Sequence, residues 1–206
     1  MHIYEFFGYA AGAIGVYLAI PQARNIRRLG HGEGVSLSYW LIMLVMMSSW
    51  LSYGILIDSP SIILSNLLGF FTTAMVVSAL LKRGWMFWPV VVVAGAAWVL
   101  IFKLIPLEII TVVLVVGTFS RIPQIIRSVQ NLRRGVASAV SMRSQFMSLT
   151  AMLLWEGYSF LSGKESLVIT TTAGLTMVSI VIVLELAGRA RANRIQAIEL
   201  VDGPQA

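Results

Sequence analysis

Two tryptophans, an asparagine and a threonine are the side chains of this sequence best suited to binding a small polar solute. Trp50 and Asn66 lie eight residues on either side of Asp58, and Trp155 and Thr171 are likewise sixteen residues apart. In a helical hairpin with its turn midway, both members of such a pair lie at one depth, roughly 12 Å from the turn at about 1.5 Å per residue. An indole face packs on C–H groups, and an amide or a hydroxyl pairs with hydroxyl groups. The four residues therefore predict a binding site for a solute with an apolar face and a polar rim.

Each of these residues also has a simpler explanation. Tryptophan is enriched at membrane interfaces, so Trp50 and Trp155 could be belt or packing residues. Asn66 could be a polar clamp between two helices. Its amide cannot be left unsatisfied in hydrocarbon, so in either case we expect it to face protein or water.

The elements that carry these residues are predicted to be membrane-spanning helices. Of 206 residues, 58% are hydrophobic and 12% are charged, and the mean hydropathy is +0.85, which soluble domains do not reach. A span needs roughly 20 apolar residues. Seven stretches qualify, at 3–23, 36–57, 60–81, 85–104, 106–126, 138–162 and 165–187. The sequence therefore predicts an all-α polytopic membrane protein, whose first span lacks the features of a cleaved signal peptide.

An internal repeat organises these spans. Ile20-Pro21-Gln22 ends the first span, and Ile122-Pro123-Gln124 lies at the end of the fifth. A shift of 105 residues then places Trp155-Glu156-Gly157-Tyr158 on Trp50-Leu51-Ser52-Tyr53. Repeated membrane segments are typical of transporters, whose substrate site lies between the copies.

The repeat predicts a 3+1+3 organisation. Residues 1–83 form the first triple-helix bundle, and residues 106–188 form the second. The span within 84–105 is a linker, because an odd number of spans would otherwise invert the second copy. Residues 189–206 are predicted to be a cytoplasmic tail.

The basic residues predict the orientation in the membrane. With the N-terminus outside and the C-terminus in the cytoplasm, the outer loops hold Lys103 and Lys164, and Arg121 lies within the membrane. The cytoplasmic side then collects Arg24, Arg27, Arg28, Lys82, Arg83, Arg127, Arg133, Arg134, Arg143, Arg189, Arg191 and Arg194. This asymmetry follows the positive-inside rule. It also indicates that the net charge of +6 faces anionic lipid rather than nucleic acid.

The two Pro-Gln pairs predict a hinge. Proline within a helix removes a backbone hydrogen bond and permits a bend, so Pro21 and Pro123 are candidate hinges. The amides of Gln22 and Gln124 can satisfy the freed carbonyls or meet across the pseudo-two-fold axis as a gate on the cytoplasmic side. Alternatively, the glutamines simply hold helices together. We expect an Arg-rich loop after each pair.

Two charges within the predicted spans stand at positions where the first repeat is uncharged. Arg121 aligns with Ala19, and Glu156 aligns with Leu51. Charges at membrane depth are costly and mark candidate functional sites. Arg121 is a coupling site or snorkels to the cytoplasmic face, and Glu156 takes up a proton or faces an outer vestibule. Their helical positions differ in height by roughly 12 Å, so we expect no ion pair between them.

Several kinds of chemistry have no residues to support them. Without cysteine there is no disulfide or thiolate chemistry, and the two histidines, His2 and His31, lie at or beyond helix ends, so no metal site is predicted. The sequence also lacks a nucleophile with a base and orienting partner, and it lacks a phosphate-binding loop. We therefore expect neither an enzyme nor a bound cofactor.

These motifs resemble the SWEET sugar transporters and their half-size relatives, the SemiSWEETs, within the MtN3/saliva or PQ-loop group. The run from Ser36-Leu37-Ser38-Tyr39-Trp40 through Trp50-Leu51-Ser52-Tyr53-Gly54 to Ser65-Asn66-Leu67-Leu68-Gly69 is similar to a SemiSWEET second and third helix. The resemblance implies a uniporter in the cell membrane that carries mono- or disaccharides by alternating access. It also implies that Asn66 contacts substrate. A homo-oligomer is compatible with this organisation.

The sequence departs from the family at two points. Thr170-Thr171-Thr172 stands where many SWEETs have a second asparagine, and the second and sixth spans lack the prolines that SWEETs carry there. The alternative is therefore a PQ-loop carrier of another small solute, such as an amino acid, with Glu156 as a proton site. A retinal receptor is disfavoured because the last span has no lysine below its outermost turn.

Overall fold

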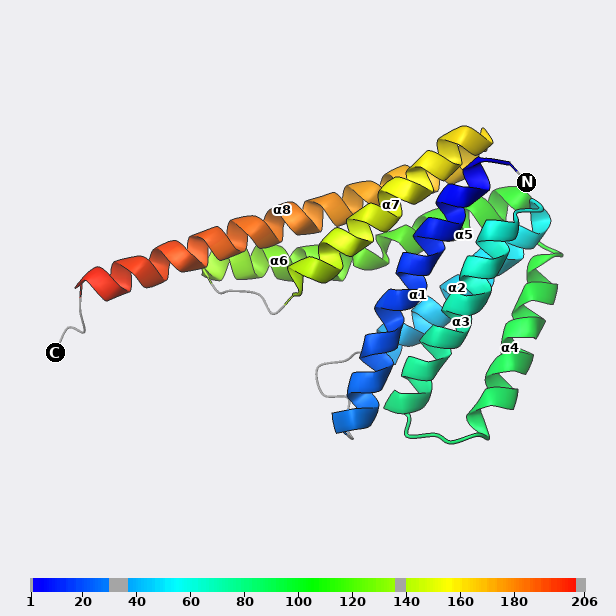
Figure 1. The fold of residues 1–206 in the computed structure, drawn as a ribbon, viewed down its shortest axis with the longest axis horizontal. Coiled ribbons are helices and arrows are strands. Elements are labelled where there is room, and N and C mark those ends of the chain that lie inside the picture. Colours follow the sequence, from blue (N-terminus) through cyan, green and yellow to red (C-terminus); the bar gives the residue numbers. More distant parts are fainter. Residues whose placement is uncertain (1, 30–36, 136–139, 203–206) are drawn as a thin grey trace.

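The computed structural model describes residues 2–29, 37–135 and 140–202, and every regular element in these ranges is helical. In chain order the elements are α1 (Tyr4–Leu29), α2 (Leu37–Leu56), α3 (Pro60–Leu80), α4 (Phe87–Phe102), α5 (Leu107–Thr118), the 3₁₀ turn η1 (Phe119–Arg121), α6 (Ile122–Arg134), α7 (Met142–Ser162) and α8 (Glu165–Asp202). Figure 1 shows these elements as long helices joined by short connections.

Five helical segments are long and apolar enough to cross a membrane: α1, α2, α3, the continuous segment Leu107–Arg134, and α8. The helix α4 is apolar but shorter, with 16 residues, and α7 has 21 residues but is less apolar. The prediction of an all-helical, multi-pass membrane protein is confirmed.

Tight turns form the two hairpins predicted to carry the binding residues. Between α2 and α3, Asp58 adopts a positive φ of 52°, Ser59 caps α3 by accepting from the Ile62 N–H, and Pro60 begins the helix, where its missing N–H costs nothing. Between α7 and α8, Gly163 ends α7 with a φ of 67°, a conformation that glycine adopts without strain. Both turns lie at the same end of the molecule, which we name the hairpin end.

The helices form two three-membered groups with the same internal packing. In the first unit, α1 to α3, the helix α3 packs against both α1 and α2. In the second unit, α5 to α8, the helix α8 packs against α7 and against the segment formed by α5, η1 and α6. The helix α4 lies outside both groups and packs against α2.

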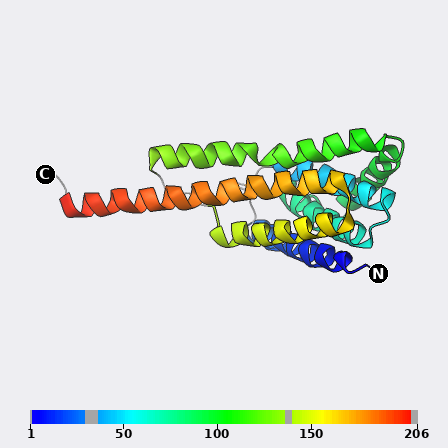
Figure 2. The ribbon, with the colours of Figure 1, turned by 90° about the horizontal axis from the view of Figure 1, so that it is seen from above.

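The two units contact each other reciprocally. The helix α1 packs against α7, and α2 packs against α5. Figure 1 shows the units close together at the hairpin end and diverging toward the opposite end, which we name the arginine end, and Figure 2 shows α8 extending beyond the other helices.

Three helices are longer than predicted, which corrects the expected Arg-rich loops. The first helix continues past Pro21 to Leu29, and α6 continues to Arg134, so the described arginines after both Pro-Gln pairs lie on helices. Arginine is a good helix former, and α6 ends at the first glycine it meets, Gly135. The predicted tail is likewise helical as far as Asp202.

Candidate functional site

A cavity of about 230 Å³ lies between the two units. All four predicted binding residues line it: Trp50 and Asn66 from the first unit, and Trp155 and Thr171 from the second. The lining also includes Tyr39, Met43, Met46, Met47, Ile62, Gly117, Thr118, Ser120, Arg121, Met152, Leu167, Thr170 and Gly174. Residues separated by more than 100 positions in the sequence therefore surround one space.

The two tryptophans are held in matching ways. The ring of Trp50 packs edge-to-face on Tyr53 with centroids 5.7 Å apart, and that of Trp155 packs edge-to-face on Tyr158 at 5.6 Å. Both tyrosines are only 1% exposed. Because the tyrosines are fixed in the core, they orient the half-buried indoles.

The two polar members of the site are not equivalent. Asn66 Nδ2 donates one hydrogen bond, 2.8 Å long, to the Ile62 carbonyl, which leaves a second amide N–H and Oδ1 for a ligand. Thr171 Oγ1 lies 3.0 Å from the Leu167 carbonyl, to which it donates, and 2.9 Å from Ser159 Oγ. The Thr171 hydroxyl is thus already hydrogen-bonded within the second unit, whereas the Asn66 amide can still donate one hydrogen bond and accept others.

Methionines that the sequence interpretation missed form much of the cavity wall. A Cβ added at Gly69 would lie 2.8 Å from Met47 Sδ, and one added at Gly174 would lie 3.1 Å from Met152 Sδ. Each glycine therefore makes room for a methionine that lines the cavity. The shift of 105 residues also relates Met47 to Met152, so the repeat could have revealed the pair. Thioether side chains are flexible and polarizable, so this wall can adapt its shape.

The two predicted charge sites lie in different surroundings. Arg121 belongs to the 3₁₀ turn η1 and lines the cavity. Glu156 is absent from the cavity lining, and its Oε1 accepts a hydrogen bond from the exposed Thr172 hydroxyl at 2.5 Å. Its other oxygen, Oε2, is buried and has no hydrogen-bond partner among the described residues.

The Pro-Gln residues also differ between the units. Pro21 lies inside α1, and the side chain of Gln22 lies outside the described part of the structure. Pro123 follows the 3₁₀ turn and is the second residue of α6, so a break in the helix stands beside it. Gln124 Nε2 donates to Ser128 Oγ at 3.4 Å on its own helix. Ser128 Oγ is in turn 2.6 Å from Glu185 Oε1 on α8.

Reciprocal tyrosine bonds join the units at the hairpin end. Tyr53 OH of the first unit lies 2.7 Å from Ser166 Oγ of the second, and Tyr158 OH of the second lies 2.7 Å from Ser59 Oγ of the first. The repeat aligns Tyr53 with Tyr158, so this pair could also have been found from the spacing.

A buried acid strengthens one of these contacts. Glu5 is 4% exposed, and its Oε2 accepts from the backbone N–H of Ser61 at 2.8 Å, in the first turn of α3. Its Oε1 accepts from Tyr158 OH at 3.4 Å. Lys164 Nζ adds a further link by donating to the Ile57 carbonyl of the first unit at 3.1 Å. Glu5 was not singled out from the sequence, because a lone acid at the start of a span gives no signal of its partners.

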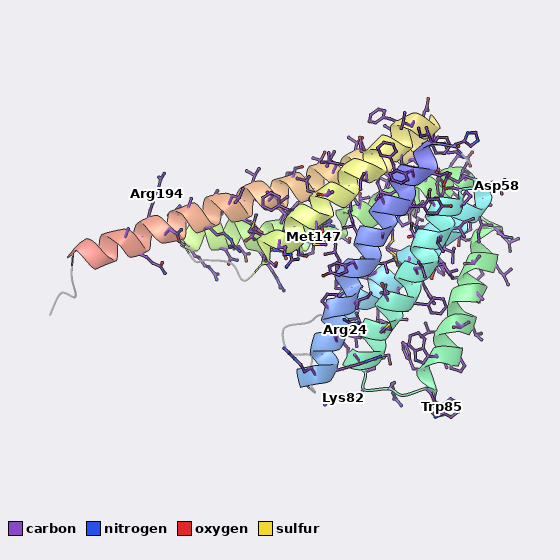
Figure 3. All side chains as sticks on the ribbon, in the orientation of Figure 1. Arg24, Asp58, Lys82, Trp85, Met147 and Arg194 are labelled. Atoms are coloured by element: carbon purple, nitrogen blue, oxygen red, sulfur yellow. The ribbon has the colours of Figure 1, made fainter. Side chains whose placement is uncertain are left out.

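The charged residues segregate by end. Figure 3 shows Arg24 and Lys82 at the opposite end of the first unit from Asp58. Arg194 lies far out on the extension of α8, away from the hairpin end. The arginine end is thus the more basic part of the molecule, while the described lysines of the hairpin end are Lys103 and Lys164.

Residues 7–82 match a family model described as "Sugar efflux transporter for intercellular exchange". The match runs from the first turns of α1 to just beyond α3, so it covers the first unit. It confirms the resemblance to the SWEET (MtN3/saliva) family that the motifs indicated, and with the apolar helices it supports a multi-pass protein of the cell membrane. Comparison with curated proteins and with solved structures found no match.

Proposed function

We propose that this protein carries small sugars across the cell membrane as a facilitative uniporter that works by alternating access. The observation that carries the proposal is the cavity between the units, in which two held tryptophans and the Asn66 amide face one space. An indole stacks on the C–H face of a sugar ring, and the amide pairs with ring hydroxyls. The first unit, which supplies Trp50 and Asn66, matches the sugar efflux family.

The size of the cavity favours a monosaccharide over a disaccharide. Sites for drug-sized ligands occupy roughly 300–1,000 Å³, whereas this cavity has about 230 Å³. A disaccharide would therefore require the units to separate further.

The packing of the helices supports the 3+1+3 organisation with parallel repeats. In each unit the last helix packs against the other two, and the contacts between units are reciprocal, as a pseudo-two-fold axis requires. The basic arginine end would face the cytoplasm by the positive-inside rule, which puts the N-terminus and the hairpin end outside.

In this orientation the structure corresponds to an inward-facing state. The Tyr53–Ser166 and Tyr158–Ser59 bonds hold the outer end together, while the units diverge toward the cytoplasm. Alternating access would break these bonds and bring the inner ends together. Pro21, and Pro123 beside the 3₁₀ turn, are the proposed hinges for this movement. We place Gln22 and Gln124 at the inner gate.

The alternative is a proton-coupled carrier of another solute, such as an amino acid. Its support is the buried, unpartnered Oε2 of Glu156. However, Glu156 does not line the cavity, so a proton bound there would not touch the solute. The sugar proposal is therefore preferred.

Uptake into proteoliposomes separates the two proposals. A panel of labelled sugars and amino acids is offered with and without an imposed pH gradient. We expect uptake of a monosaccharide that equilibrates without the gradient. Uptake of an amino acid alone, driven by an inward proton gradient, would refute the sugar proposal and favour the alternative.

A further inference from the structure

Arg121 gives the cavity a charge that a neutral sugar does not need. Among the described residues that line the cavity it is the one charged side chain, and no carboxylate stands beside it. The guanidinium carries five N–H donors and a positive charge. Its position in the turn between α5 and α6 places it in the wall of the cavity between the units.

The Arg121 charge has no partner side chain within the described ranges of the protein. Arg121 takes part in no hydrogen bond or ion pair with the described residues. The buried or half-buried acids do not line the cavity, and each contacts another residue through at least one oxygen: Glu5 at the hairpin end, Glu156 with Thr172, and Glu185 with Ser128. A cation in a partly desolvated cavity without a counter-ion is costly, unless the ligand supplies the opposite charge.

The charge also belongs to one unit only. The first unit has the buried Ala19 at the aligned position. A framework built from two copies therefore holds a single cation, off the pseudo-two-fold axis. This arrangement suits a ligand with an anionic group at one end and a neutral ring at the other.

We propose that the preferred substrate is a monosaccharide bearing one carboxylate, a sugar acid of the hexuronate class, whose carboxylate binds Arg121. The proposal rests on the sugar carrier function proposed above and specifies its substrate. A planar guanidinium binds a carboxylate through two parallel hydrogen bonds, while Trp50 and Trp155 contact the ring. A sugar phosphate is disfavoured because its charge of about −1.5 to −2 exceeds that of one arginine.

The test compares substrates that differ at one group. Glucose and glucuronate share a ring and differ at C6, where glucuronate has a carboxylate in place of the hydroxymethyl group. Glucose 6-phosphate tests whether a phosphate binds in place of the carboxylate. Affinity is measured by calorimetry on the detergent-purified protein, and transport by counterflow in proteoliposomes. The variants are Arg121→Gln and Arg121→Lys, and the matched control is Arg127→Gln, an exposed arginine on α6 that does not line the cavity.

For the native protein we expect glucuronate to bind at least about 10-fold more tightly than glucose, as a charge-assisted pair allows. Arg121→Gln should lower the preference for glucuronate over glucose by about the same 10-fold factor, and Arg121→Lys should lower it by less. Arg127→Gln should leave this preference unchanged. This pattern would support the proposal.

Other outcomes would overturn it in distinguishable ways. If the native protein carries glucose as well as or better than glucuronate, the anion proposal is wrong and sugar transport stands. If glucose 6-phosphate is preferred, the carboxylate is the wrong anion. If none of the three sugars binds or moves, the proposed function fails with it. Because the first comparison uses native protein, it holds even if Arg121→Gln does not fold.

Discussion

The two three-helix units share a framework but differ where they face the solute. Trp50 and Trp155 pack on equivalent tyrosines, Tyr53 and Tyr158, and both line the cavity. By contrast, the Asn66 amide of the first unit makes one hydrogen bond and keeps donor and acceptor capacity, whereas the Thr171 hydroxyl of the second unit is bonded to Leu167 and Ser159. We infer that the matched residues build the cavity and its closure, whereas the unmatched residues determine what the cavity binds.

The largest expected effect comes from removing a matched residue. Trp155→Ala and Trp50→Ala should each weaken sugar binding by about 10- to 100-fold, because each removes an aromatic surface together with its apolar contact area. Calorimetry with the transported sugar measures this loss. Trp85→Ala is the control, since Trp85 is 79% exposed and lies outside the cavity. Equal losses in Trp85→Ala would mean that the effect is not specific to the cavity.

The next prediction concerns the polar pair, whose members should not be equivalent. Asn66→Ala should weaken binding by about 10-fold, because a substrate hydroxyl loses its partner in a partly desolvated site, at about 1–3 kcal/mol. Thr171→Ala should cost less, since the Thr171 hydroxyl is already bonded to Leu167 and Ser159. Titration of both variants with one sugar compares them directly. A larger loss in Thr171→Ala would reverse the assignment.

The hinges should affect rate more than affinity. Pro123→Ala should slow counterflow several-fold with little change in Kd, because it restores a backbone donor beside the break at η1. Pro21→Ala should have a smaller effect, because the α-helix is continuous around Pro21. Stopped-flow counterflow and calorimetry on the same preparations separate rate from affinity. Native rates in Pro123→Ala would show that the break is not a hinge.

The reciprocal tyrosines allow a subtler comparison. Tyr158→Phe loses contacts with Ser59 and Glu5, whereas Tyr53→Phe loses one with Ser166. At about 1 kcal/mol per hydrogen bond, Tyr53→Phe should shift the equilibrium toward the outward-open state by about 5-fold, and Tyr158→Phe by more. Labelling of a single cysteine at Ile57 from outside reports this opening. An unchanged labelling rate in both variants would show that these bonds do not hold the outer end closed.

The smallest effect is expected for Thr171→Asn. This change restores the second amide that many SWEETs carry, and we expect sugar affinity to remain within about 3-fold of native or to increase. A loss beyond this range, measured by the same titration, would indicate that the second unit has no room for an amide.

The sequence predicted the hairpins well and the helix ends poorly. The positions of Trp50, Asn66, Trp155 and Thr171 about their turns follow from helical rise alone, and all four line one cavity. The extension of α8 to Asp202 could not be anticipated from hydropathy, which reports where apolar residues stop rather than where a helix stops. The partners of Glu5 were equally inaccessible, because they depend on how α1, α3 and α7 meet at the hairpin end.

We propose that the transported solute occupies the cavity between the units. The sequence has no native cysteine, and Met43 lines the cavity, so Met43→Cys places a single thiol there. The measurement is its rate of labelling by a small maleimide in proteoliposomes, with and without a saturating concentration of the transported sugar, with Trp85→Cys as the control. We predict that the sugar slows labelling of Met43→Cys by about 5-fold or more, in line with occupancy of one shared space, and leaves Trp85→Cys unchanged. Equal labelling of Met43→Cys with and without a sugar that the same preparation transports would show that the sugar does not occupy this cavity.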